Sequence, residues 1–108
     1  MEMNSYQDAA RKTAAYPDVG RNPIYPTLGL TGEAGEVADK VKKVIRDREG
    51  VFDADTREAI KLELGDVLWY VAQLASELGY DLDEVLCFLL RSQEARGLHP
   101  WSAFGPCV

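Results

Sequence analysis

The sequence is poor in features that mark several common classes of protein. It has one histidine, His99, two cysteines, and no run of about 18 apolar residues that would cross a membrane. The start, MEMNSYQDAARK, has no basic segment followed by an apolar one, so we expect no secretory signal and a cytoplasmic protein. No C-x-x-C pair is present. Cys87, in an apolar helical run, and Cys107, in the tail, are therefore expected to be thiols rather than a disulfide.

An excess of positive charge is also missing. The chain has 12 basic residues against 18 acidic ones, a net charge of −6. Non-specific nucleic-acid binding needs a basic surface that releases counterions, so nucleic acid is not an expected partner. An acidic protein can still bind a phosphorylated small molecule when a divalent cation lies between the two. The arrangement of the acids along the chain is therefore the informative feature.

The 108 residues are enough for one domain, 1–108, with a single core. Four segments have helical apolar periodicity between capping and stop signals, and no strand pattern competes with them. The expected helices run from Asn4 or Ser5 to about Ala15, from Pro26 or Thr27 to about Arg48, from Asp55 to Gly79, and from Asp81 to about Arg96. Glu58 and Glu84 would complete capping boxes with Asp55 and Asp81.

These helices predict an all-α four-helix bundle in which the second and third helices form a long central antiparallel hairpin. Between the first two helices lies the link YPDVGRNPIYP, residues 16–26, with three prolines. A link of this length in a small domain is expected to be either mobile or functional.

Two short motifs repeat along the chain: GEAGEV at 32–37 and LELGDV at 62–67. Each contains two acids three residues apart, Glu33 with Glu36 and Glu63 with Asp66, so each pair lies on one face of its helix. Each pair also borders the apolar stripe of its helix. Counted from the turn at about 1.5 Å per residue, Glu36 lies roughly 18 Å away and Asp66 roughly 15 Å away. The hairpin is thus predicted to bring four carboxylates together.

Four such carboxylates would repel one another and raise each other's pKa unless a cation lay between them. Oxygen donors suit Mg²⁺ or Mn²⁺. A di-iron site is disfavoured, because it uses Glu-x-x-His motifs and the single histidine lies in the tail. The alternative is that each pair is an ordinary solvated face, with Glu36 and Lys40 as an ion pair.

The solvated-face alternative does not explain Gly35 and Gly65, one in each motif. A glycine in a helix interior costs about 1 kcal/mol relative to alanine. We therefore expect another backbone to approach both positions closely.

The paired motifs resemble the signature of the MazG family of all-α nucleoside triphosphate pyrophosphohydrolases, E-x-x-E followed after a variable spacer by E-x-x-D. Here the halves are Glu33-x-x-Glu36 and Glu63-x-x-Asp66, with 26 residues between them. The surrounding LGLTGEAGEVADKVKK and ELGDVLWYVAQLA are also similar to short phage and bacterial members. The resemblance is clearest over residues 5–86, and 97–108 form an unfamiliar tail containing Trp101 and Phe104, which are candidates to cover the pocket or a dimer interface.

The resemblance implies a homodimer or homotetramer that completes the bundle. It also implies that Glu33, Glu36, Glu63 and Asp66 hold Mg²⁺, and that one of them is a candidate general base. The implied reaction cleaves a nucleoside triphosphate between its α and β phosphates, releasing a monophosphate and pyrophosphate, in housecleaning or control of the nucleotide pool.

Three further residues are candidates for substrate binding. Lys40 follows Glu36 by one helical turn and is either a phosphate ligand or a salt-bridge partner. Tyr70 occupies the place where dCTP-directed relatives have a tyrosine near the base, with a core or interface aromatic as the alternative. Arg96 is retained from an Asn, Lys and Arg set on the last helix of relatives, where this chain has Leu89 and Ser92 instead of the first two.

Two other functions are consistent with the sequence. The changed last helix suits a non-catalytic module that kept the fold and binds nucleotide or metal without turnover. A plain helical dimerisation module, with its acids only at the surface, is the second.

Overall fold

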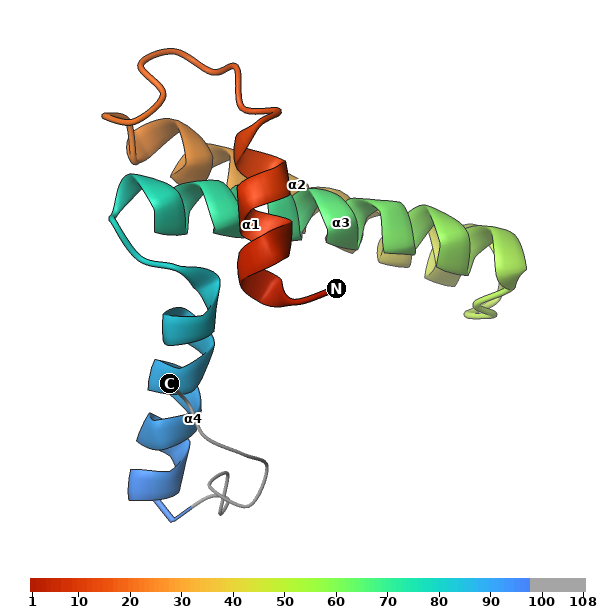
Figure 1. The fold of residues 1–108 in the computed structure, drawn as a ribbon. Helices are drawn as coiled ribbons and strands as arrows, with labels where there is room; N and C mark the ends of the chain where they lie inside the picture. The colour runs from red at the N-terminus through yellow and green to blue at the C-terminus, as the bar shows by residue number, and fades with distance from the viewer. Residues whose placement is uncertain (98–108) are drawn as a thin grey trace.

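The computed structural model describes residues 1–97, which contain four helices and no strand (Figure 1). The helices are α1 (Met3–Arg11), α2 (Ile24–Asp47), α3 (Ala54–Glu77) and α4 (Leu82–Ala95). The predicted all-α class is confirmed. Predictions that fall on His99, Trp101, Phe104 and Cys107 lie outside the described residues.

The helices α2 and α3 form the predicted central hairpin, each 24 residues long and lying side by side in Figure 1. The turn between them is closed by backbone bonds from the amides of Arg48 and Gly50 to the carbonyl of Val44. Gly50 has φ +76°, a left-handed conformation that favours glycine. The Val44 side chain is 2% exposed, so the hairpin is packed close to its turn.

The best-buried part of the structure lies where α1 crosses the other half of α3 (Figure 1). Small side chains allow this close crossing: Ala10 of α1 packs with Ala72 and Ala75 of α3 and with Leu82 of α4. Partly buried side chains pack around this cluster: Met3, Tyr6, Trp69 and Val71.

Gln7 of α1 fixes the corner between α3 and α4. Its amide nitrogen donates to the Ser76 hydroxyl and to the Tyr80 carbonyl, both at 3.0 Å, and its oxygen accepts from the Leu82 amide at 2.8 Å. A buried side chain with all these partners satisfied holds the two helices in one orientation.

The last helix, α4, leaves the hairpin at a steep angle (Figure 1). Among the described residues it contacts α1 and α3 but not α2. Its apolar side chains are therefore incompletely covered, and Phe88 is 78% exposed. Several residues of the predicted apolar faces also remain exposed in this chain, including Ile45, Leu64 and Leu78.

Several helix boundaries differ from the predicted ones, including the start of the first helix, where Glu2 and not Asn4 or Ser5 is the N-cap. The first helix ends at Arg11 rather than about Ala15, and α2 begins at Ile24 rather than at Pro26 or Thr27. Pro26 lies in the first turn of α2, where its missing N–H removes no helical hydrogen bond. The proline therefore marked the start of the helix to within two residues.

The predicted N-cap of α3 is wrong, since Asp53 and not Asp55 caps the helix. The Asp53 carboxylate accepts from the Thr56 amide at 2.9 Å and from the Thr56 hydroxyl at 3.0 Å. Both acids have a polar residue three positions later, and the local pattern did not distinguish them. The capping box of α4 is confirmed, because Asp81 accepts from the Glu84 amide and Glu84 accepts from the Asp81 amide.

The thiol predicted at Cys87 is also wrong, because Cys87 on α4 is disulfide-bonded. An apolar helical setting suits a buried thiol and half of a disulfide equally well. The sequence context therefore could not discriminate between them.

In the part of the chain that is described, no helix is both long and apolar enough to span a membrane.

The corrected cap gives a direct test. Replacing Asp53 with Ala removes the acceptor for the first turn of α3, and we expect the melting temperature to fall by roughly 4 to 8 °C. Asp55→Ala is the matched control, two residues away and exposed, and it should change the melting temperature little. Thermal unfolding followed by circular dichroism measures both. An equal loss in the two variants would contradict Asp53 as the cap.

Candidate functional site

The hairpin brings three of the four predicted acids together. Glu33 of α2 and Glu63 and Asp66 of α3 each offer a carboxylate oxygen, and these three oxygens lie within 4.8 Å of one another. Glu33 and Glu63 are partly buried. We call these three residues the acidic group.

Glu36 lies one turn further along α2, exposed to solvent and outside the acidic group. The predicted register placed Glu36 beside Asp66, whereas Glu33 takes that place. The difference is three residues, or about 4.5 Å along the helix axis. Such an offset is within the error of locating two helix ends from sequence.

Protonation within the acidic group follows from its surroundings. Burial raises the pKa of Glu33, and a hydrogen bond with Glu63 and the charge of the nearby acids raise it further. The pKa of Glu63 is lowered, chiefly by a hydrogen bond from Lys40 and also by one from Glu33, although burial opposes the change. The two pKa values are thus shifted in opposite directions, so Glu33 takes up a proton more readily than Glu63.

Lys40 forms an ion pair across the hairpin. Its ammonium nitrogen lies 3.0 Å from a carboxylate oxygen of Glu63, whereas the sequence suggested Glu36 as the partner. The lysine side chain is still 30% exposed. It neutralises part of the charge that the two helices bring together.

Tyr70 lies one turn after Asp66, beside the acidic group. Burial raises its pKa, and its neighbours Tyr25, Glu33 and Asp66 raise it further. Its ring packs edge-on against Trp69, with centroids 5.0 Å apart and planes at 89°. Tyr70 is therefore a partly buried aromatic that faces the acids.

The close approach that was predicted for Gly35 and Gly65 occurs instead at Gly29. Among the described residues, nothing lies within 4 Å of a Cβ built at Gly35 or at Gly65, so that prediction is wrong for this chain. A Cβ built at Gly29 would overlap the ring of Tyr70. The close neighbour is an aromatic side chain rather than a backbone.

Arg96 is not brought to the acidic group within one chain. It follows the C-terminal end of α4, where its guanidinium donates to the Ser92 carbonyl at 3.2 Å. That end of α4 is the part furthest from the hairpin in Figure 1. Its phosphate-binding role stays a prediction.

Sequence reasoning missed Gly29 and Tyr25. Gly29 lies in the same glycine-containing segment of α2 as Gly35. The cost of a glycine inside a helix was the available sign that Gly29 has a structural role. Nothing local marked which glycine has a close neighbour. Tyr25 was overlooked because it was assigned to the link, although it lies in the first turn of α2 and stacks on Tyr16, nine residues earlier.

The donor set suits a hard divalent cation. All three members of the acidic group are carboxylates, Glu36 is a fourth one turn away, and no histidine or cysteine sulfur takes part. Oxygen-only donors of this charge match Mg²⁺ or Mn²⁺.

A helical hairpin with carboxylates from both helices defines the class: an all-α protein with a candidate site for a divalent cation. The family follows from comparison with known proteins. Residues 24–99 match the MazG nucleotide pyrophosphohydrolase domain, and the chain belongs to this family.

A curated relative is the Gene 37 protein of Mycobacterium phage L5, which is 49% identical over 90 residues. The match covers 79% of this chain and 79% of the phage protein. No solved structure matches the chain significantly.

The two kinds of glycine should respond oppositely to an added methyl group. Gly29→Ala forces the Tyr70 ring to move, so we expect the free energy of unfolding to fall by about 1 to 3 kcal/mol. Gly35→Ala is the matched control on the same helix, and it should raise that free energy by up to about 1 kcal/mol, because alanine favours a helix. Urea denaturation without added metal measures both. Destabilisation by Gly35→Ala would show a close neighbour that the single chain lacks.

Proposed function

We propose that this protein is a Mg²⁺-dependent nucleoside triphosphate pyrophosphohydrolase, which cleaves a ribo- or deoxyribonucleoside triphosphate between the α and β phosphates. The products are a nucleoside monophosphate and pyrophosphate. The observation that carries the proposal is the convergence of three carboxylate oxygens, from two helices, within 4.8 Å. Membership of the MazG family supports the choice of substrate and bond.

In this proposal Glu33, Glu63 and Asp66 hold the cation, with Glu36 one turn away as the fourth acid. Bound there, Mg²⁺ would neutralise triphosphate charge and lower the pKa of a water. One of the four carboxylates would accept the proton of the attacking water. The lysine that now pairs with Glu63 would be displaced by the cation.

The substrate would lie along the exposed side of this group. Tyr70 is proposed to stack on the base, since aromatic faces bind bases and this ring already borders the acids. Lys40 is proposed to bind a phosphate when Glu63 binds the cation instead of the lysine. Arg96 would contribute only if a second copy of the chain brought it to the hairpin.

A homodimer or homotetramer is part of the proposal. Apolar side chains on the hairpin and on α4 are exposed in the single chain: Leu64, Leu68, Phe88 and Leu89. Exposed apolar surface of this kind is typical of a face that a second copy covers. We also propose that the whole chain is one domain, and that it acts in the cytoplasm in nucleotide housecleaning or pool control.

The second candidate is a non-catalytic module with the same fold. The exposed position of Arg96 and the loss of the other two residues of its set favour it. Such a module would bind Mg²⁺ and nucleotide without releasing pyrophosphate.

The central test measures monophosphate and pyrophosphate after incubation with Mg²⁺ and a panel of eight standard nucleoside triphosphates. We expect at least one to be hydrolysed, and Glu33→Gln, Glu63→Gln and Asp66→Asn to lower kcat about a hundredfold or more, because each removes a charged ligand. Glu36→Gln tests the fourth acid. The matched control is Glu58→Gln, an exposed acid of α3 that pairs only with Lys61 among the contacts described.

Thermal stability separates the alternatives. A cation at about 100 times its dissociation constant stabilises the folded state by about 2.7 kcal/mol. Stabilisation by Mg²⁺ without any product supports the non-catalytic module, and no stabilisation at all supports a plain dimerisation module. Full activity in Asp66→Asn would contradict the assignment of the site.

Lys40→Gln examines the cross-hairpin ion pair. The ammonium and the cation compete for Glu63, so we expect Mg²⁺ to bind more tightly in this variant, whereas KM for the nucleotide should rise several-fold with the loss of a phosphate contact. Lys43→Gln is the control, since Lys43 pairs with Asp39 on its own helix. A Mg²⁺ titration followed by thermal shift, with steady-state kinetics, gives both values. Unchanged Mg²⁺ affinity would contradict the competition.

A further inference from the structure

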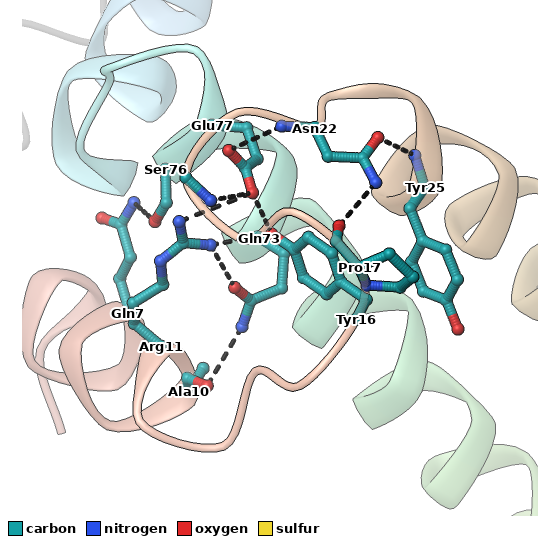
Figure 2. A network of polar contacts seen from close by, with 11 residues as sticks. Gln7, Ala10, Arg11, Tyr16, Pro17, Asn22, Tyr25, Gln73, Ser76 and Glu77 are labelled. Carbon is teal, nitrogen blue, oxygen red and sulfur yellow. Dashed lines mark hydrogen bonds and ion pairs between the residues drawn. The ribbon is translucent and has the colours of Figure 1, made fainter.

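A second carboxylate, Glu77 near the end of α3, is buried away from the acidic group. Its side chain is 0% exposed. Four donors point at it, all from α1 or from the link between α1 and α2 (Figure 2). They are the Tyr16 hydroxyl, the Gly20 amide at 2.9 Å, the Asn22 amide at 3.3 Å and the Arg11 guanidinium at 3.5 Å.

These donors keep Glu77 ionised in spite of its burial. Burial raises the pKa of the carboxyl, but the hydrogen bonds from Tyr16, Gly20 and Asn22 and the charge of Arg11 lower it overall. Arg11 is itself fixed, because it donates to the Gln73 amide oxygen at 2.9 Å and to the Tyr16 hydroxyl at 2.8 Å. The link is thus tied to α3 by charge-assisted bonds, which are the stronger kind.

Part of the link has a left-handed backbone conformation, which the contacts with Glu77 help to hold. Asp18 and Gly20 have φ of +55° and +97°, in the left-handed region. Asn22 closes the rest: its side chain donates to the Pro17 carbonyl at 2.8 Å and accepts from the Tyr25 amide at 3.1 Å, in the first turn of α2. Through Asn22, the hydrogen bonds to Glu77 therefore also fix the start of α2.

The same contacts lead to the acidic group. Tyr16, which donates to Glu77, stacks on Tyr25 with ring centroids 5.1 Å apart and planes at 9° (Figure 2). Tyr25, Gly29 and Glu33 follow one another at intervals of four residues on α2, so they lie along one face of that helix. The ring of Tyr70 lies against Gly29, between Tyr25 and Glu33 on this face. The buried carboxylate is thus connected through Tyr16 and Tyr25 to the face of α2 on which the Tyr70 ring lies.

We propose that Glu77 is a positioning residue for nucleotide binding: by holding the link, it places Tyr25 and Tyr70 as an aromatic wall beside the acidic group. The inference rests on the proposed function. The side chain of Glu77 is buried and would not touch the substrate. It acts through Tyr16 and Tyr25 on the part of the site that receives the base, whereas the acids are held by the packing of α2 on α3.

Because Glu77 acts on the aromatic side chains and not on the acids, its substitution should change KM more than kcat. In Glu77→Gln the side chain keeps its size but loses its charge, so the link loosens while the hairpin stays packed. We expect KM for the nucleotide to rise about tenfold and kcat to change less than about twofold. Stabilisation by Mg²⁺ alone should equal that of the wild-type protein.

Two further variants and two physical readouts complete the experiment. Tyr16→Phe removes one donor to Glu77 but keeps the ring that stacks on Tyr25, so it is the milder change and should give a smaller rise in KM. Glu58→Gln is the exposed control. Hydrogen exchange should show loss of protection at the Gly20 and Asn22 amides in Glu77→Gln, and trypsin should cut faster after the exposed Arg21 of the link.

The outcomes are distinct. A wild-type KM in Glu77→Gln, or equal losses in KM, kcat and Mg²⁺ stabilisation, would overturn the positioning role, the second pattern being that of general destabilisation. If the wild-type protein hydrolyses no nucleotide, the proposed function fails separately. The inference is then decided by the exchange data and by ring contacts between Tyr25 and Tyr70 in NMR spectra: their loss in Glu77→Gln supports it, and their persistence overturns it.

Discussion

The structure depends on one electrostatic constraint: packing α2 against α3 forces carboxylates from both helices into a small volume. Like charges at this separation repel, and partial burial weakens the screening by water. The ammonium of Lys40 pairs with Glu63, and burial, a hydrogen bond with Glu63 and the charge of the nearby acids raise the pKa of Glu33. The Lys40 contact is replaceable, because the lysine side chain is partly exposed. A group balanced by removable charges suits reversible binding of a cation.

Glu77 shows the opposite solution to the problem of a buried carboxylate. Its donors are two backbone amides, a buried hydroxyl and a guanidinium held by Gln73, and all belong to the fold itself. No metal ion is needed to satisfy it, and removing it would leave several donors without an acceptor. The two sites therefore differ in their hydrogen-bond donors. The acidic group has too few donors from the protein to balance its charge, whereas the Glu77 carboxylate is satisfied by donors from the protein.

Features set by neighbouring residues were predictable from the sequence, and those set by distant ones were not. Helical periodicity placed each pair of acids on one face, and the Asp81 capping box was readable because its partner lies three residues away. The N-cap of α3 was misjudged because Asp53 and Asp55 offered equal local signals. Glu77 meets Gly20 and Asn22 across 57 and 55 residues, and no local pattern marks such a contact. Three of the four acids converge as predicted, and the offset of Glu36 is one helical turn.

The two halves of the site are held by different forces. The hairpin that carries the acids is packed near its turn at Val44, and apolar burial of this kind is non-directional and tolerates exchange among side chains of similar volume. The link that carries Tyr16 and leads to Tyr25 rests on directional bonds to one carboxylate. A substitution in the link therefore alters the aromatic wall without disturbing the acids. In the proposed enzyme, we therefore expect changes in the link to alter the choice of base and sugar, and changes in the hairpin to alter the proposed metal site.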